Sequence, residues 1–260
     1  MLRAPIIAAF ALFAAAPSLP QAAVPAENVA PRHAYPAIER IGWSYGEGSI
    51  HGGPADQLRF FRERHFNSSS GPQESADVKA IIATIAATHA GDRVSFTLTR
   101  EAGALACSGR AEEGGHASGT CRFDPDQVFA AGLTRHGIAA EDSDAMLGLT
   151  LVDAHIATVD GLAAEGFRFQ NAGELIAVSA LGVTPAYAGD LRAAGLQVDA
   201  IGDLIAARAL KIDAQWLADM ARAGYPDLAV GKAIQMRALG ITPDYAIRMG
   251  RVLHAVHEIE

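Results

Sequence analysis

The segment Gly42-Trp43-Ser44-Tyr45-Gly46 has the G-x-S-x-G spacing of a nucleophile elbow, in which a serine attacks an acyl carbon. An elbow requires a strand before the serine and a helix after it, and the oxyanion segment of such hydrolases precedes the nucleophile. Here strand-like sequence follows Ser44, and His51-Gly52-Gly53 comes after the serine. We therefore predict a solvent-facing serine in a strand, and we keep an exported hydrolase that uses Ser44 as the alternative hypothesis.

Two further segments contain metal-ligating residue types without the spacing of a metal site. His254, His257 and Glu258 share the last expected helix, but they lack the H-E-x-x-H pattern and a clear third ligand. Glu141-Asp142-Ser143-Asp144 resembles part of a calcium loop, but it lacks the glycine and the distant glutamate of such a loop. We interpret the first segment as a solvated helix end and the second as an acidic helix start. We therefore predict no metal and no other cofactor.

The two cysteines, Cys107 and Cys121, flank a polar, glycine-rich segment that predicts a turn near Gly114. A turn centred there places the cysteines opposite each other on two antiparallel strands. Because an exported chain matures where thiols oxidise, we predict a disulfide rather than two free buried thiols.

Residues 1–23 have the features of a secretory signal peptide, with Arg3 before an apolar run at 5–16 and small residues at Ala22 and Ala23. The run is shorter than the roughly 20 residues that a membrane-spanning helix needs. We expect cleavage rather than an uncleaved anchor, no membrane span in the mature chain, and a periplasmic or secreted location. The net charge of −8 argues against nucleic acid as a partner, because such proteins carry basic faces.

The first half of the mature chain predicts a small sheet. Residues 24–40 contain several prolines and no apolar period, so we interpret them as a linker. Aromatic residues, alternating patterns and turn signals over 41–124 then predict a β-rich domain with one helix. The expected elements are strands at 41–50, 56–65, 93–100, 103–111 and 117–124, and a helix at 76–89. Sequence does not determine the order of these strands.

A 29-residue period organises the rest of the chain. Ala180-Leu-Gly-Val-Thr-Pro-Ala-Tyr187 returns as Ala209-Leu-Lys-Ile-Asp-Ala-Gln-Trp216 and as Ala238-Leu-Gly-Ile-Thr-Pro-Asp-Tyr245. Such a period predicts a repeat array, in which each unit is a pair of short helices that is stable only when it packs on its neighbours. The predicted fold class is therefore α+β, with the sheet domain followed over 125–260 by an all-α array of helical hairpins.

Each unit carries signals for the ends of its better-marked helix. Thr184, Asp213 and Thr242 have side-chain oxygens suited to a helix N-cap. Glycines such as Gly195 and Gly224 stand where these helices must end. Four columns of apolar residues predict the buried faces. In the better-marked helix they are Phe129, Thr158, Tyr187, Trp216 and Tyr245, then Leu133, Leu162, Leu191, Met220 and Met249; in the other helix they are Leu147, Ile176, Ile205 and Ile234, then Val152, Leu181, Leu210 and Leu239.

The array offers two candidate binding surfaces. The aromatic column that includes Trp216 forms a binding strip if it is exposed, but its position beside Leu191 and Met220 favours core packing. In that case the ligand surface lies on the opposite polar faces. The candidate residues there are Asp190, Arg192, Asp219, Arg222 and Arg248.

The repeat phrases, together with Val94-Ser-Phe-Thr-Leu-Thr-Arg-Glu-Ala-Gly103 and Gly119-Thr-Cys-Arg-Phe-Asp-Pro125, resemble a group of bacterial exported proteins. Similar repeats are appended to antirepressor zinc metallopeptidases of the beta-lactam-sensor type. The resemblance runs from Val94 onward and implies a location outside the cytoplasmic membrane and a role in interaction or sensing. It implies no peptidase activity, because the H-E-x-x-H zinc helix of those enzymes is absent from this sequence.

The sequence as a whole predicts an exported, non-enzymatic module that binds a protein or cell-envelope ligand. Two alternatives stay open. One is an exported hydrolase that uses Ser44 or the C-terminal histidines, and the other is a passive structural protein of the envelope.

Overall fold

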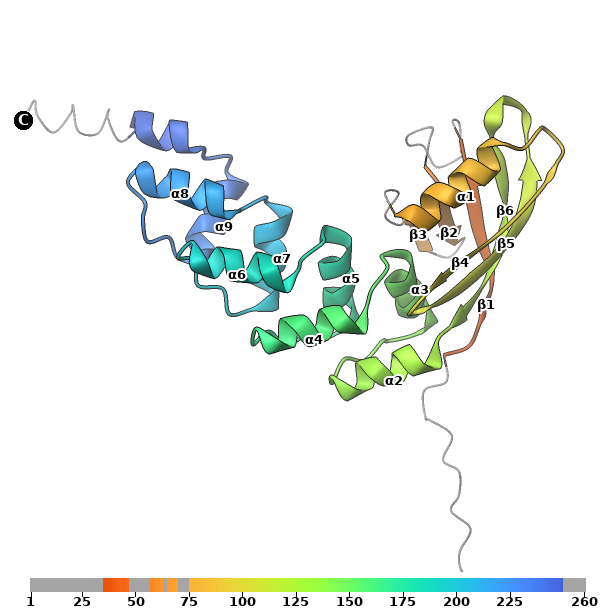
Figure 1. The fold of residues 1–260 in the computed structure, drawn as a ribbon, viewed down its shortest axis with the longest axis horizontal. Coiled ribbons are helices and arrows are strands. Elements are labelled where there is room, and N and C mark those ends of the chain that lie inside the picture. The colour runs from red at the N-terminus through yellow and green to blue at the C-terminus, as the bar shows by residue number, and fades with distance from the viewer. Residues whose placement is uncertain (1–34, 47–56, 63–64, 70–74, 250–260) are drawn as a thin grey trace, which may run out of the picture. The chain divides into compact units, whose positions relative to one another are not determined.

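The computed structural model describes residues 35–46, 57–62, 65–69 and 75–249, and the fold class is α+β, as predicted. A six-stranded antiparallel sheet has the order β3-β2-β1-β6-β5-β4. A row of short helices follows it in the chain (Figure 1). The strands are β1 (Ile38–Tyr45), β2 (Arg59–Arg62), β3 (His65–Ser69), β4 (Arg93–Arg100), β5 (Gly103–Ala111) and β6 (Ala117–Pro125).

The sheet matches the predicted strands with two corrections. The predicted linker ends earlier than residue 40, since β1 begins at Ile38 and the Tyr35 hydroxyl already donates to the carbonyl oxygen of Ala140 at 2.9 Å. Strand β3 was not predicted, because its serines and the following Gly71-Pro72 read locally as a turn. It forms by pairing with β2, which is a tertiary contact.

The turn between β5 and β6 lies where the sequence predicted it. Gly114 in the short 3-10 turn Glu113–Gly115 has φ of 76°, a conformation that glycine adopts without steric cost. Cys107 and Cys121 are direct partners in the β5–β6 register, and they form a disulfide with a Cα–Cα distance of 4.0 Å. The predicted disulfide is therefore confirmed.

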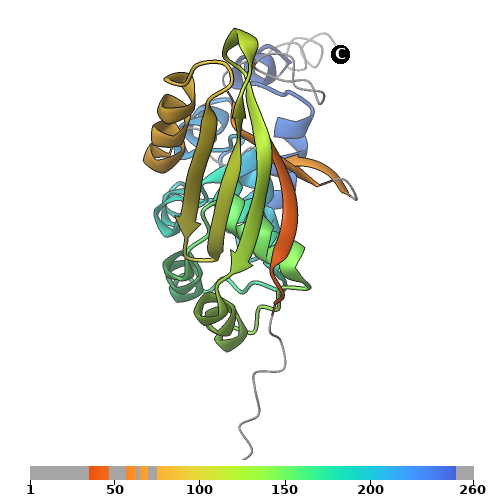
Figure 2. The same cartoon turned by 90° about the vertical axis from the view of Figure 1, so that its right-hand side faces the viewer.

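One face of the sheet forms the core, and α1 (Ala76–Ala86) covers part of it. The strands β3 and β4 are the two edges of the sheet, so α1, which lies between them in sequence, crosses this inner face. The side chains of Trp43, Leu105 and Phe123 are fully buried there. The opposite, outer face of β1, β6, β5 and β4 is covered by no helix of the described chain, as Figure 2 shows.

The helices of the array form two alternating rows. They are α2 (Gln127–Arg135), α3 (Ser143–Leu151), α4 (Ile156–Ala164), α5 (Ala172–Leu181), α6 (Pro185–Ala193), α7 (Ile201–Ala209), α8 (Ala214–Arg222) and α9 (Val230–Ala238), and residues 243–249 are also helical. Each helix packs mainly on the next but one, so α3, α5, α7 and α9 make one row and α2, α4, α6 and α8 the other. This is the nearest-neighbour packing of a repeat array.

Local capping fixes the ends of the repeat helices as predicted. The side chains of Thr184, Asp213 and Thr242 accept hydrogen bonds from backbone N–H groups three residues later, at 3.1, 2.7 and 3.2 Å. Gly195 and Gly224 have φ of 90° and 98°, the left-handed conformation that ends a helix. Each of these contacts joins residues close in sequence, which is why the sequence alone predicts them.

The buried faces confirm one pair of columns and shift the other. Phe129, Tyr187 and Trp216 are buried, whereas Tyr245 at the end of the described array is 46% exposed. In the other row, the columns that contain Ile176 and Leu181 are mostly half-buried. Neighbouring positions are more deeply buried: Met146, Leu175, Leu204 and Ala233 in one column, and Ala154, Val183 and Ile212 in another.

Arginines join successive units. Nε of Arg208 donates to the carbonyl oxygen of Leu181 at 3.1 Å, and Nε of Arg237 donates to that of Leu210 at 2.9 Å. Their guanidinium groups lie over the rings of Tyr187 and Trp216, at 5.0 and 5.6 Å from the ring centroids. Each arginine therefore satisfies a helix C-terminus of the preceding unit and makes a cation–π contact.

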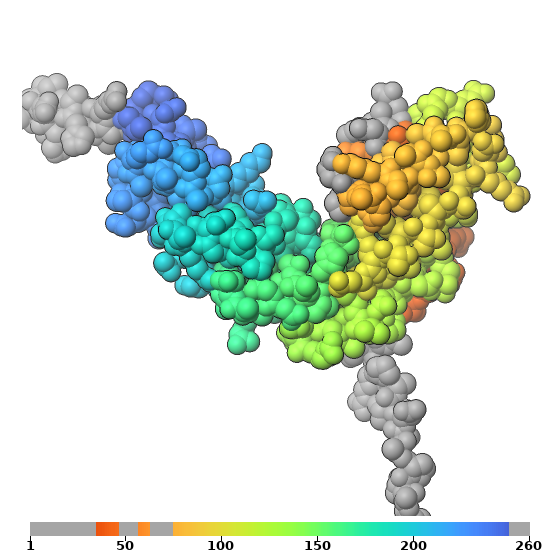
Figure 3. All heavy atoms as spheres, viewed as in Figure 1, coloured from red at the N-terminus to blue at the C-terminus, as the bar shows by residue number. Residues whose placement is uncertain are grey.

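The described residues form one compact unit, and the turn between β4 and β5 connects the sheet to the array. Arg100 donates to the carbonyl oxygens of Thr150 and Leu151, at 3.1 and 3.0 Å, at the end of α3. The neighbouring Glu101 accepts a hydrogen bond from the backbone N–H of Ile156 at 3.1 Å, at the start of α4. The cation thus meets the negative end of one helix, and the carboxylate meets the positive end of the next. In Figure 3 the spheres of the sheet and those of the first helices adjoin.

Among the described residues, no single helix is long and apolar enough to cross a membrane. The pair α3 and α4, bent by 83°, meets the length and composition criteria only when both helices are taken together.

Candidate functional site

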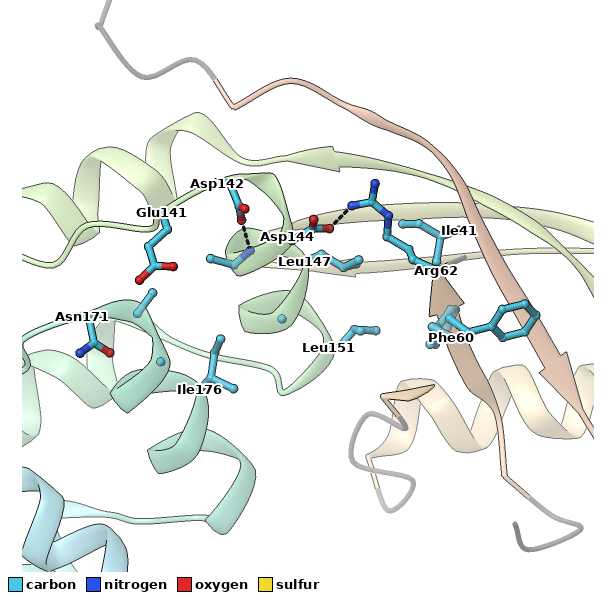
Figure 4. Close-up of a pocket in the computed structure, with 15 residues that line it drawn as sticks. Ile41, Phe60, Arg62, Glu141, Asp142, Asp144, Leu147, Leu151, Asn171 and Ile176 are labelled. Atoms are coloured by element: carbon cyan, nitrogen blue, oxygen red, sulfur yellow. Dashed lines mark hydrogen bonds and ion pairs between the residues drawn. The ribbon is translucent and has the colours of Figure 1, made fainter. Parts of the chain in front are cut away.

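A groove of about 660 Å³ lies between the sheet and the first repeat units. One wall comes from β1 and β2, and the other comes from α3 along its length and from the N-terminal half of α5 (Figure 4). Its size falls in the range of small-molecule and side-chain binding pockets. The lining residues are Ile41, Phe60, Phe61, Arg62, Glu141, Asp142, Asp144, Ala145, Leu147, Gly148, Leu151, Asn171, Ala172, Gly173 and Ile176.

The floor of the groove is apolar. Leu147, Leu151 and Ile176 from the helices face Ile41 and Phe60 from the strands (Figure 4). The helical wall contains the small residues Ala145, Ala172 and Gly173. Longer side chains at these positions would fill the groove. The groove can therefore accept an apolar group of a ligand.

Gly148 sets the distance between the two helices of that wall. A Cβ atom at this position would lie 2.9 Å from Cδ1 of Ile176, closer than carbon atoms pack. The glycine therefore lets α3 and α5 approach each other closely.

The rim of the groove is polar and mostly acidic. Asp142 caps α3 by accepting from the N–H of Ala145 at 2.9 Å, and Asn171 caps α5 in the same way at 3.0 Å. Asp144 forms an ion pair with Arg62 of β2. Glu141 is exposed at the rim, and no ion pair involving it is present among the described residues. The groove thus offers an apolar floor and a carboxylate at its edge.

The acidic segment 141–144 is a helix start, as predicted. Asp142 is the N-cap of α3 and Asp144 lies in its first turn, where negative charge is favoured by the helix dipole. Burial and the charge of Asp142 raise the pKa of the nearby Tyr35 hydroxyl above its usual range. That hydroxyl is therefore a neutral donor to Ala140.

Ser44 does not lie at an elbow. It is inside β1, where it pairs with Arg59 of β2 on one side and Ser118 of β6 on the other. Tyr45 continues the strand, so the sharp turn into a helix that exposes a nucleophile is missing at this position. The prediction that Ser44 faces solvent is wrong, because the residue is only 9% exposed.

The other candidate catalytic and metal-ligating residues, His51, His254, His257 and Glu258, fall outside the described residues. Within the described residues, no group of three or more His, Cys, Asp or Glu side chains is placed to hold a metal ion.

The structure does not assemble the predicted surface of the array into one site. Asp190 and Arg248 are exposed. Asp219 pairs with Arg222 on the same helix and also accepts from Gln215 at 2.9 Å. None of these residues lines the groove.

Two of the predicted surface residues have structural contacts instead. Arg192 pairs with Glu165 at 2.8 Å and lies 4.9 Å from the ring centroid of Phe167, so it joins neighbouring units. Trp216 is only 6% exposed and packs in the core, so core packing, the favoured interpretation of its column, is confirmed at this position and its place among the candidate binding residues is wrong. Its position in the buried column, beside Met220, was the signal for this outcome.

Sequence reasoning missed the groove because its residues come from segments more than a hundred positions apart. Ile41 and Ile176 look like ordinary core residues, and nothing in their local sequence shows that they meet. The paired caps Asp142 and Asn171, which are 29 positions apart, are the one signal that the repeat period carries to this site.

Comparison of this chain with protein-family models, curated proteins and solved structures gives no match. The resemblance to exported repeat proteins therefore stays a prediction.

Proposed function

We propose that this chain is an exported, non-enzymatic interaction module, and that the groove between the sheet and the helices α3 and α5 binds an apolar side chain of a protein or cell-envelope ligand. The observation that carries the proposal is the apolar floor formed by Phe60, Leu147 and Ile176 inside a groove of about 660 Å³. Deeply placed apolar side chains are the usual anchors of protein recognition.

Export is part of the proposal. The signal-like residues 1–23 and the Cys107–Cys121 disulfide support it, since disulfides persist in oxidising compartments. N-terminal sequencing of the protein released from the producing cell is expected to start near residue 24. A protein that still begins at Met1 would contradict export by this route.

The binding role is tested by filling the groove. A displayed library of random peptides is selected on the full chain, and the recovered peptides are measured against Ala145→Phe, which places a ring in the groove. The control is Ala157→Phe, at an exposed position of α4 outside the groove. We expect recovered peptides to lose binding to the first variant and to keep it with the second.

The same experiment separates the alternatives. Peptides that bind both variants equally would put the ligand site outside the groove. A library that yields no binder would favour a passive structural protein. Hydrolysis of ester or amide substrates that disappears in Ser44→Ala would favour an enzyme over the interaction module.

A further inference from the structure

The uncovered outer face of the sheet contains a second depression, of about 870 Å³, that the proposed function does not use. Its lining residues belong to β4, β5 and β6 and the turn after β5. Strand alternation puts the exposed ones on the face away from the buried core, the face that Figure 2 shows without a covering helix. The exposed side chains that line it are polar: Arg93, Ser95, Ser108, Arg110, Glu112, Ser118 and Thr120.

Strand register brings these side chains together in two rows. Arg93 is the direct partner of Arg110 across β4 and β5. The next row on the same face pairs Ser95 with Ser108, and Ser108 in turn pairs with Thr120 of β6. Direct partners on one face have Cβ atoms about 5 Å apart, so the two arginines are neighbours on this face and the row of three hydroxyl residues is next to them.

The arginine pair is not neutralised by the protein. Like charges directly opposite each other destabilise a sheet, yet neither Arg93 nor Arg110 forms an ion pair with a carboxylate of the described chain. Arg110 donates only to the carbonyl oxygen of Gly91, at 3.1 Å. This arrangement stands out in a chain whose net charge is −8.

Arg122 on the same face shows the contrasting case. Its guanidinium pairs with Glu39 at 3.1 Å and with Asp124 at 2.7 Å, and these neighbours raise its pKa. The sheet therefore supplies carboxylates to one exposed arginine and leaves the facing pair of arginines without them.

We propose that Arg93 and Arg110 bind a tetrahedral oxyanion, a phosphate or sulfate group carried by a soluble ligand. Planar guanidinium groups donate in pairs to such oxygens, and the hydroxyls of Ser95, Ser108 and Thr120 supply further donors. The anion relieves the repulsion between the two arginines. Glu112, which also lines the depression, accepts from the Ser118 hydroxyl at 2.6 Å. Ser118 is the partner of Arg110 on the β6 side, so the anion lies on the opposite side of Arg110, between it and Arg93.

A soluble ligand fits this face better than a bilayer surface. Binding to an anionic membrane requires a broad basic or apolar surface, and the outer face also presents Glu39, Glu112 and Asp124. The large exposed apolar residues of the described chain lie elsewhere: Val128, Tyr225, Leu239, Tyr245 and Met249.

The test is a titration of the full chain with inorganic phosphate and, separately, with sulfate, followed through the backbone amide NMR signals of β4 and β5. We expect saturable shifts with a dissociation constant in the millimolar range. Arg93→Gln and Arg110→Gln should each weaken binding about tenfold, because each removes one charged donor group. Glu112→Gln should tighten it, because it removes a nearby negative charge.

The matched control is Arg122→Gln, which removes the same charge from the same face and should leave the affinity within about twofold. Thermal melting separates this site from a structural role, since Arg93→Gln should not lower the melting temperature in phosphate-free buffer. An absence of saturable shifts, or an equal loss in Arg122→Gln, would overturn the proposal. So would binding to phosphatidylglycerol vesicles without binding to phosphate, because that result points to a membrane surface.

Discussion

Replacement of Arg100 is the sharpest test of how the sheet and the array are joined. Its side chain is only 2% exposed and pairs with Asp77 at 3.1 Å and with Asp153 at 3.5 Å. It also donates to the Ser75 hydroxyl and to the two carbonyl oxygens at the end of α3. In Arg100→Met the alkyl stem keeps its packing, but these polar partners lose their donor.

The expected loss follows from the partners left behind. Breaking a buried ion pair by removing one partner costs about 3–5 kcal/mol. The carboxylates of Asp77 and Asp153 reach solvent, with 41% and 33% of their side chains exposed, so we expect the lower end, about 3 kcal/mol. This is a large fraction of the roughly 5–15 kcal/mol that stabilises a folded protein. Arg100→Lys keeps the charge but not the forked geometry of the guanidinium group, so its free energy of unfolding should lie between those of the parent and Arg100→Met.

The assay is urea denaturation followed by circular dichroism on the oxidised chain. Arg122→Met is the control, because its ion pairs are exposed to solvent and such pairs contribute little to the free energy of unfolding. The double variant Arg100→Met with Asp77→Asn should lose less free energy of unfolding than the sum of the losses in the two single variants, since both side chains belong to one network of ion pairs. A free energy of unfolding for Arg100→Met within about 1 kcal/mol of the parent value would show that the contacts of Arg100 do not stabilise the junction.

Three further predictions follow from the contacts of Cys107–Cys121, Tyr187 and Asp77. Replacing both cysteines by alanine should cost roughly 3 kcal/mol in the chain-entropy description of a loop of this size, measured by denaturant unfolding; under non-reducing conditions mass spectrometry should find neither thiol alkylated. Burial, together with the charge of Asp213, raises the pKa of Tyr187 to about 12 against an opposing effect of Arg208, so the folded state keeps this proton longer than the unfolded state. Stability should be intact below about pH 10 and fall as the pH rises from about 10 to about 12, and Tyr187→Phe should remove this part of the alkaline loss. Partial burial opposes ionisation of Asp77, but hydrogen bonds from Ser75 and Val78 and the charge of Arg100 outweigh it and lower its pKa. The ionised Asp77 should therefore stabilise the folded state above the pKa of the unfolded chain, and this stabilisation should be lost as the pH falls through the lowered pKa of the folded state. The melting temperature of Asp77→Asn should depend less on acidic pH than that of the parent.

Much of the helical half is determined by the sequence alone. The caps Thr184 and Asp213 and the terminator Gly195 act through hydrogen bonds and backbone angles within a few residues, so their types and spacing are sufficient. The pairing of Cys107 with Cys121 is predictable for the same reason, because a short turn fixes the register of the strands on either side.

The tertiary structure decided what depends on contacts between distant segments. The place of β1 between β2 and β6, the burial of Ser44 and the formation of β3 depend on which strands pair, and no local signal carries that choice. The same holds for Arg100, which looks like a surface residue beside a turn and instead satisfies carbonyl oxygens fifty positions away.

The two candidate sites differ in how much of each the sequence determines. The groove needs the sheet and the array together, since its walls come from the strands β1 and β2 and from the helices α3 and α5. The alternating pattern of β4 and β5 supplies polar residues to one sheet face, but only the register sets Arg93 against Arg110. Sequence by itself determined the period, the caps and the alternation, because these are short-range; the tertiary structure decided which faces meet, because burial is a property of the whole chain.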